Sequence, residues 1–87
     1  MPYIKQEYRP EYEEVVNALT FAMDNMRAGD LNYVIFAATK RYIKHHGMGY
    51  ERLRDILAEL DECRSELRRR FMFGHENSKI LENGDVE

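Results

Sequence analysis

The sequence predicts an all-α domain of three helices with an ordered carboxy-terminal tail. Three segments repeat apolar residues at intervals of three and four, the spacing that gives a helix one apolar face. Glycines separate these segments, and glycine is the residue that most often ends a helix. No segment of the 87 residues shows the polar–apolar alternation of a long strand. The predicted helices therefore cover residues 10–27, 31–46 and 50–73.

The first helix is predicted to begin at Pro10, because proline is favoured in the first helical turn. Glutamates follow, where the helix dipole favours negative charge, and Gly29 is predicted to cap the carboxy end. Residues 1–8 are predicted to form an extended arm. The apolar face comprises Tyr12, Val15, Val16, Leu19, Ala22, Met23 and Met26.

The second helix is predicted to have Asp30 as its amino-terminal cap, because aspartate accepts hydrogen bonds from free backbone N–H groups. Basic residues gather near its carboxy end, where the dipole favours positive charge. Gly47 and Gly49 are predicted to end it. Its apolar face comprises Leu31, Val34, Ile35, Ala38, Tyr42 and Ile43.

The third helix is predicted to be the spine of the domain, with a length of roughly 30 Å at 1.5 Å per residue. Its apolar face comprises Leu53, Ile56, Leu57, Leu60, Cys63, Leu67 and Phe71. In the tail, residues 74–87, Asn83-Gly84 predicts a turn and Lys79–Leu81 admits a short strand. The chain is thus predicted to be one domain, with residues 9–73 as its helical core.

The composition predicts a small protein that shares its core with a copy of itself. A chain of 87 residues with 44% hydrophobic residues encloses little core, and the single cysteine, Cys63, precludes an internal disulfide. A lone cysteine, no signal peptide and no apolar run of about 20 residues predict a cytoplasmic protein without a membrane partner. We therefore expect a cytoplasmic homo-oligomer.

The net charge of −3 is divided unevenly along the chain. Residues 1–26 sum to −3, residues 27–70 to +3 and residues 71–87 to −3. Binding to extended nucleic acid depends on a dominant basic excess, which this chain lacks. The pattern therefore favours self-association over nucleic-acid binding.

Several segments carry a family resemblance, above all the terminal stretch Lys79–Val86. The others are Leu31–Ile35, Tyr42–Lys44, Tyr50–Leu53, Leu60–Cys63 and Arg69–Arg70. With these residues the chain resembles a family of small uncharacterised proteins of bacteria and their phages that share a terminal Lys-Ile-x-x-Asn-Gly-Asp-Val pattern. The resemblance covers most of the chain and implies no activity. The chain departs from the family at Gly74-His75-Glu76, where a proline and a tyrosine are expected before the glutamate.

The sequence predicts neither a metal site nor a catalytic centre. Cys63, His45, His46 and His75 lack the paired spacing of zinc ligands, and Ser65 and Ser78 have no local histidine partner. One enzymatic alternative remains, a magnesium-dependent all-α nucleotide pyrophosphatase. Two Glu-x-x-Glu pairs, Glu11 with Glu14 and Glu59 with Glu62, could face one another and hold the metal.

The sequence favours a site for a small anionic, nucleotide-like ligand at a subunit interface. Guanidinium groups bind phosphate through paired hydrogen bonds, and aromatic rings stack on bases. The arginines also suit the end of a helix and the aromatics suit a core, so the site is a hypothesis about these residues. Its predicted members are Arg64, Arg68, Arg69, Tyr33, Tyr42, Asn32, Asn83 and Asp85, with Arg41 as a further candidate.

These observations predict a non-enzymatic, oligomeric binding protein without a cofactor. In the favoured version, arginines hold phosphate, tyrosines stack, and the tail closes the pocket, as in a sequestering protein carried by phage. The alternatives are an adaptor whose only partner is another protein, suited to exposed apolar faces and adaptable methionines, and the pyrophosphatase described above.

Overall fold

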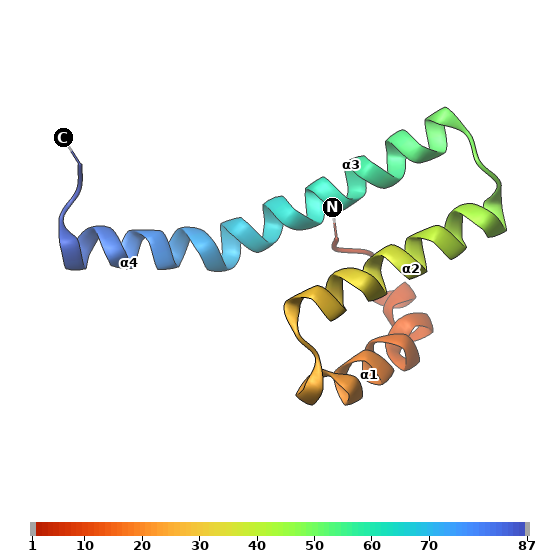
Figure 1. The fold of residues 1–87 in the computed structure, drawn as a ribbon, viewed down its shortest axis with the longest axis horizontal. Coiled ribbons are helices and arrows are strands. Elements are labelled where there is room, and N and C mark those ends of the chain that lie inside the picture. The colour runs from red at the N-terminus through yellow and green to blue at the C-terminus, as the bar shows by residue number, and fades with distance from the viewer. Residues whose placement is uncertain (1, 87) are drawn as a thin grey trace. The chain divides into compact units, whose positions relative to one another are not determined.

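The computed structural model describes residues 2–86, which contain helices and no strand (Figure 1). This confirms the all-α prediction. Met1 of the predicted arm and Glu87 of the predicted tail lie outside the described residues. In chain order the elements are the 3₁₀ helix η1 (Gln6–Tyr12), α1 (Glu13–Ala22), the 3₁₀ turn η2 (Met23–Asn25), α2 (Ala28–His46), α3 (Tyr50–Leu67), the π-helical turn η3 (Arg68–Met72) and α4 (Phe73–Asn83).

The chain divides into two compact units. One unit is Tyr3–Ile56, which holds η1, α1, η2, α2 and the first two turns of α3. The other begins at Leu57, includes Pro2, and holds the remainder of α3 with η3 and α4. No helix among the described residues is long and apolar enough to cross a membrane.

The first predicted helix, residues 10–27, differs from its prediction at both ends, because α1 covers Glu13–Ala22 and the following 3₁₀ turn ends at Asn25. Residues 6–12 form a 3₁₀ helix that contains Pro10, so the predicted extended arm ends at Lys5. This helix begins with a bond of 3.0 Å from the Tyr8 N–H to the Lys5 carbonyl. Proline lacks an N–H to donate and its ring obstructs the preceding α-helical turn. The α-helix therefore starts only at Glu13.

The amino end of α2 is capped by Asp30 from inside the helix. The helix begins at Ala28, so Gly29 lies within it. The prediction that Gly29 caps the end of the preceding helix is therefore wrong. Asp30 Oδ2 accepts hydrogen bonds from the Arg27 backbone N–H at 3.1 Å and from Arg27 Nε at 3.2 Å. The bond from the Arg27 backbone, followed by that from its side chain, lowers the pKa of Asp30 from its ordinary value. Asp30 thus caps through the reverse contact of a capping box.

The carboxy end of α2 is tied to the start of α3 by one arginine. Gly47 ends the helix with a φ of 91°, a conformation that side chains disfavour. Arg52 Nη1 donates hydrogen bonds to the carbonyl oxygens of His46 and Gly47, the latter at 2.6 Å. The last carbonyls of a helix have no partner within it, so the guanidinium supplies a needed donor.

The third predicted helix extends ten residues beyond its predicted end. Helical structure continues without a break from Tyr50 to Asn83, through the π turn at Arg68–Met72 (Figure 1). The Lys79–Leu81 stretch therefore lies in α4 and forms no strand. The Asn83-Gly84 turn is found at the end of this helix, where Gly84 has a φ of 84°. Within α4, Lys79 pairs with Glu82 at 3.2 Å.

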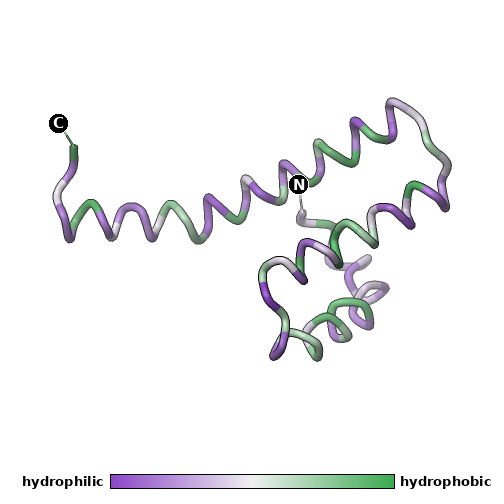
Figure 2. Tube along the Cα trace, in the orientation of Figure 1, coloured by the Kyte–Doolittle hydropathy of each residue, from purple (hydrophilic) through white to green (hydrophobic). Residues whose placement is uncertain are grey.

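Apolar residues recur along every helix (Figure 2), yet none of the described residues is buried. Seven apolar residues of the Tyr3–Ile56 unit are half-buried, namely Leu19, Met26, Val34, Ala37, Ile43, Leu53 and Ile56. Larger side chains in the same unit remain exposed, including Phe21 at 91% and Tyr33 at 71%. The helices are therefore defined more firmly by their ends than by a common core.

Replacing Asp30 with alanine should destabilise α2, because the Arg27 N–H then loses its acceptor. The pKa of Asp30 is lowered in the folded chain, so its contribution is present above the ordinary value of 3.8 and is lost as the pH falls through the lowered value. Circular dichroism during thermal unfolding should show a stability gap between wild type and Asp30→Ala at neutral pH that closes in acid. Asp24→Ala, at an exposed site in η2, is the control and should show no such gap.

Replacing Arg52 with alanine should lower the free energy of unfolding by roughly 1.5–3 kcal/mol, the range for hydrogen bonds that involve a charged group. Arg52→Lys should recover only part, because an ammonium lacks the planar fork. Arg54→Ala is the matched control, since exposed Arg54 has, among residues 2–86, only Asp55 as an ion-pair partner, at 3.7 Å, and its effect should stay within about 0.5 kcal/mol. Urea unfolding followed by circular dichroism measures all three; equal losses for Arg52→Ala and Arg54→Ala would remove the capping role.

Candidate ligand groove

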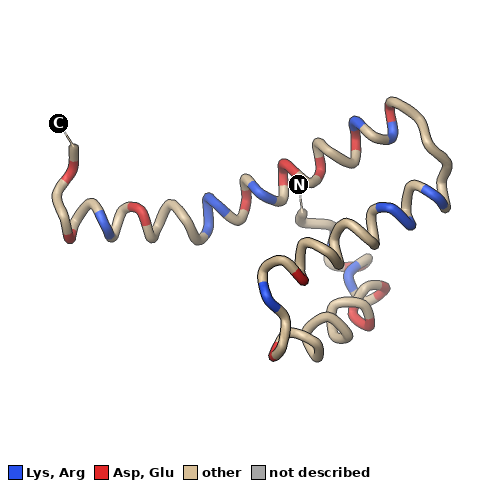
Figure 3. The backbone as a smooth tube through the Cα atoms, viewed as in Figure 1, with Lys and Arg blue, Asp and Glu red and all other residues tan. Residues whose placement is uncertain are grey.

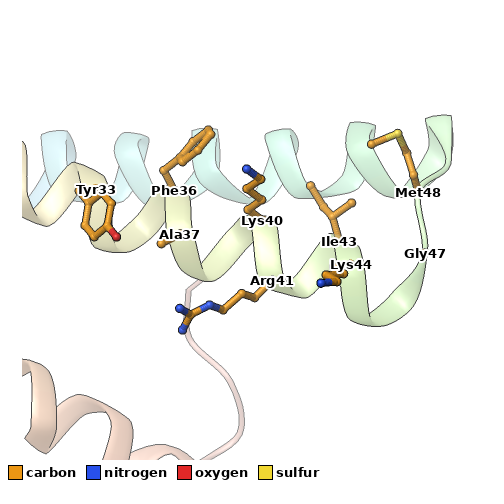
Figure 4. A pocket seen from close by; sticks show the side chains of 9 residues that line it. All are labelled: Tyr33, Phe36, Ala37, Lys40, Arg41, Ile43, Lys44, Gly47 and Met48. Carbon is orange, nitrogen blue, oxygen red and sulfur yellow. The ribbon is translucent and has the colours of Figure 1, made fainter.

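A groove of about 630 Å³ runs along α2 from Tyr33 to Lys44 and onto the loop after the helix (Figure 4). Helical spacing places its lining together, because residues three and four apart share a face. The whole groove belongs to the Tyr3–Ile56 unit. It is lined by Tyr33, Phe36, Ala37, Lys40, Arg41, Ile43, Lys44, Gly47 and Met48.

Three cations give this groove its electrostatic character. Lys40, Arg41 and Lys44 lie near the carboxy end of α2 (Figure 3), where the negative end of the helix dipole stabilises them. None of the three forms an ion pair with a residue of the described range 2–86. In a chain of net charge −3, the groove is therefore a local positive surface without an internal counter-ion.

The groove is walled by apolar side chains on which a flat ring can rest. Tyr33 is 71% exposed and Phe36 is 63% exposed, so both rings present a free face. Met48 extends the wall beyond Gly47 and is also exposed. Aromatic faces stack on heterocyclic bases, and a nearby cation can bind the anionic part of the same ligand. The groove thus combines the two chemistries that a nucleotide requires.

Two of the predicted arginines have acidic partners in their own helix. Arg69 Nε donates to both carboxylate oxygens of Glu66 at 3.1 Å. Arg68 Nη2 lies 3.9 Å from Glu76 Oε1, and its guanidinium lies 5.6 Å from the ring centre of Phe73. Arg64 lies one turn before Arg68 on the same helix. Two of the three are thus partly neutralised.

The other predicted ligand residues are distributed over both units. Tyr33 lines the groove, whereas Tyr42 and Asn32 are not among the lining residues. The ring of Tyr42 packs instead on that of His46, with 4.3 Å between the ring centres. Asn83 ends α4, 15 residues after Arg68, which is about 22 Å along the helix. Asp85 accepts a bond of 2.7 Å from the Val86 N–H. Within one chain the helix itself therefore keeps Asn83 and Asp85 away from Arg68 and Arg69.

The residues weighed as metal ligands do not gather into a site. Among residues 2–86, no three or more histidine, cysteine, aspartate and glutamate side chains are placed to hold an ion. The rings of His45 and His46 contact each other edge to face at 4.8 Å, and Cys63 is exposed. Of the two glutamate pairs, Glu11 lies in a 3₁₀ helix and Glu14 in α1, while Glu59 and Glu62 each have a partner within the chain.

The sequence analysis named only Tyr33 and Arg41 as ligand residues among the nine that line the groove, and it did not name in that role Phe36, Ala37, Lys40, Ile43, Lys44, Gly47 and Met48. A signal for the cations is present in the sequence, because residues 31–50 contain no aspartate or glutamate. Lys40, Arg41 and Lys44 therefore have no acidic residue three or four positions away, where helical ion pairs form. The sequence analysis explained these cations by their position near the carboxy end of the helix, where the helix dipole favours positive charge.

Comparison with known proteins identifies the family and supplies no function. Neither the curated proteins nor the solved structures contain a match to this chain. A match over residues 1–86 shows that the chain belongs to the family described as "Domain of unknown function (DUF6899)".

Proposed function

We propose that this chain is a non-enzymatic binding protein that sequesters a small anionic ligand carrying an aromatic ring, such as a nucleotide. One observation carries the proposal, namely the α2 groove in which Lys40, Arg41 and Lys44 lie beside the exposed rings of Tyr33 and Phe36. The cations hold phosphate oxygens, and the rings stack on the base. The ligand supplies the negative charge that the described residues do not provide.

The remaining parts of the proposal concern assembly and setting. The protein works as a homo-oligomer in the cytoplasm. Its self-association is supported by the lack of buried residues in the described range and by the exposed apolar side chains. Arg64, Arg68 and Arg69 form a second basic element for the ligand at a subunit interface. Carriage by phage is supported by the terminal Lys79–Val86 pattern, which resembles bacterial and phage proteins.

Isothermal titration of the full chain with ATP, inorganic pyrophosphate and adenosine tests the ligand class. ATP should bind more tightly than the other two, because it alone uses both the cations and the rings. The double variant Lys40→Gln/Lys44→Gln should weaken ATP binding by about tenfold or more, since one charge-assisted hydrogen bond contributes about 1.5–3 kcal/mol. Lys79→Gln, whose lysine pairs with Glu82 outside the groove, should bind ATP as wild type does.

Three results would contradict the proposal in different ways. If none of the three probes binds, the adaptor alternative is favoured. If ATP binds equally to wild type and Lys40→Gln/Lys44→Gln, the α2 groove is not its site. If phosphorus NMR shows ATP loss with Mg²⁺, and Glu59→Gln or Glu62→Gln abolishes it, the protein is the pyrophosphatase and not a sequestering protein.

A further inference from the structure

We propose that two copies of this chain pair through α4 in antiparallel orientation, with Phe73 of each copy against Ile80 of the other. The inference rests on the proposed self-association and adds its surface, its orientation and the residues that meet. It concerns a different surface from the α2 groove.

The first step is that α4 has no neighbouring helix within its own compact unit. That unit begins at Leu57 and holds the remainder of α3 with η3 and α4. These three elements follow one another in a single continuous helix. Among the described residues of this unit, no second helix is therefore available to cover the apolar side chains of α4.

The second step is that α4 has an apolar face of its own. Phe73 and Ile80 are seven residues apart in this α-helix, which is two turns, so they share a face. Both are partly exposed, at 45% and 43%. Leu81, one residue further, lies on another side and is 89% exposed. An isologous contact requires a self-complementary pair of positions, and Phe73 with Ile80 supplies one.

The third step is that charge selects the antiparallel orientation. Residues 64–70 carry four arginines and one glutamate, whereas residues 76–86 carry three acidic residues and one lysine. Parallel pairing would place the arginines of the two copies side by side. Antiparallel pairing places the basic segment of each copy beside the carboxy end of the partner's α4, which carries Glu82 and is followed by Asp85, and such complementarity suppresses the wrong arrangement.

The register brings the predicted interface residues together. With Phe73 opposite the partner's Ile80, Arg70 lies opposite the partner's Asn83, and Arg68 lies level with the segment that follows the partner's helix and carries Asp85. Arg68 and Asn83, which are about 22 Å apart along one helix, thereby meet across the interface. The second copy therefore brings Asn83 close to the arginines, which a single chain does not do.

Sedimentation equilibrium of the full chain tests the surface. Wild type should be dimeric or a multiple of two, and Phe73→Glu should raise the dissociation constant about 30-fold or more, as for a truncated hot spot. Leu81→Glu is the matched control on another side of α4 and should associate as wild type does. Circular dichroism should show equal helix content in both variants. Association unaffected by Phe73→Glu would overturn the surface, although self-association itself would stand.

A charge exchange tests the register. Arg68→Glu and Asp85→Arg should each weaken association, and Arg68→Glu/Asp85→Arg should restore it. Failure of the double variant to recover would overturn this pairing of positions.

The native cysteine tests the orientation. In the antiparallel register the two Cys63 side chains are 27 residues apart along the pair, about 40 Å, so mild oxidation should give no disulfide dimer. Cys63→Ser/Asn77→Cys places the thiols near the dyad, and oxidation should cross-link it. A rapid Cys63 disulfide in wild type would show parallel helices and overturn the inference while leaving self-association intact. A wild-type monomer would overturn both.

Discussion

Each helix of this chain has an apolar face to remove from water, and the chain has few residues with which to do so. Burial of apolar surface is the main favourable term in folding, yet no residue between positions 2 and 86 is buried. Polar contacts at the helix ends therefore contribute a larger share of the stability of the helices. Asp30 holds the amino end of α2, and Arg52 joins its carboxy end to the start of α3. Such contacts fix where helices begin and end and leave their faces available to a ligand or a second copy.

Apolar spacing was enough to predict the helices, because that signal is repeated over several turns. The boundaries depended on single residues whose roles the spacing does not determine. Pro10 lies inside a 3₁₀ helix, and Asp30 caps from the third helical position. The sequence did not predict that the helix continues past Phe73, because Gly74 follows and glycine often ends a helix. A glycine inside a helix costs only about 1 kcal/mol, and extending an existing helix is far easier than starting one.

The lining of the α2 groove overlaps only in part with the ligand residues that the sequence predicts. The sequence predicted arginines as phosphate ligands, but Arg69 lies three residues from Glu66 and forms an ion pair with it. The cations of the groove have no such neighbour, and the absence of acidic residues from positions 31–50 is the more informative pattern. Tyr33 was identified from the sequence, whereas Met48 enters the groove only through the turn at Gly47, whose path no periodicity describes.

The π turn at Arg68–Met72 has a consequence for how the long helix evolves. A π turn accommodates one extra residue, and one residue corresponds to about 100° of rotation in an α-helix. The spacing of side chains in the sequence is therefore offset by one residue between α3 and α4, although the helix is continuous. Deleting one residue here would convert the wide turn into a regular α-helical turn and leave the face of α4 in its present orientation relative to the adjoining part of α3. A one-residue deletion elsewhere in the continuous helix would instead rotate one part by about 100°. The π turn is thus the position at which the helix can lose a residue without turning one contact surface away from the other.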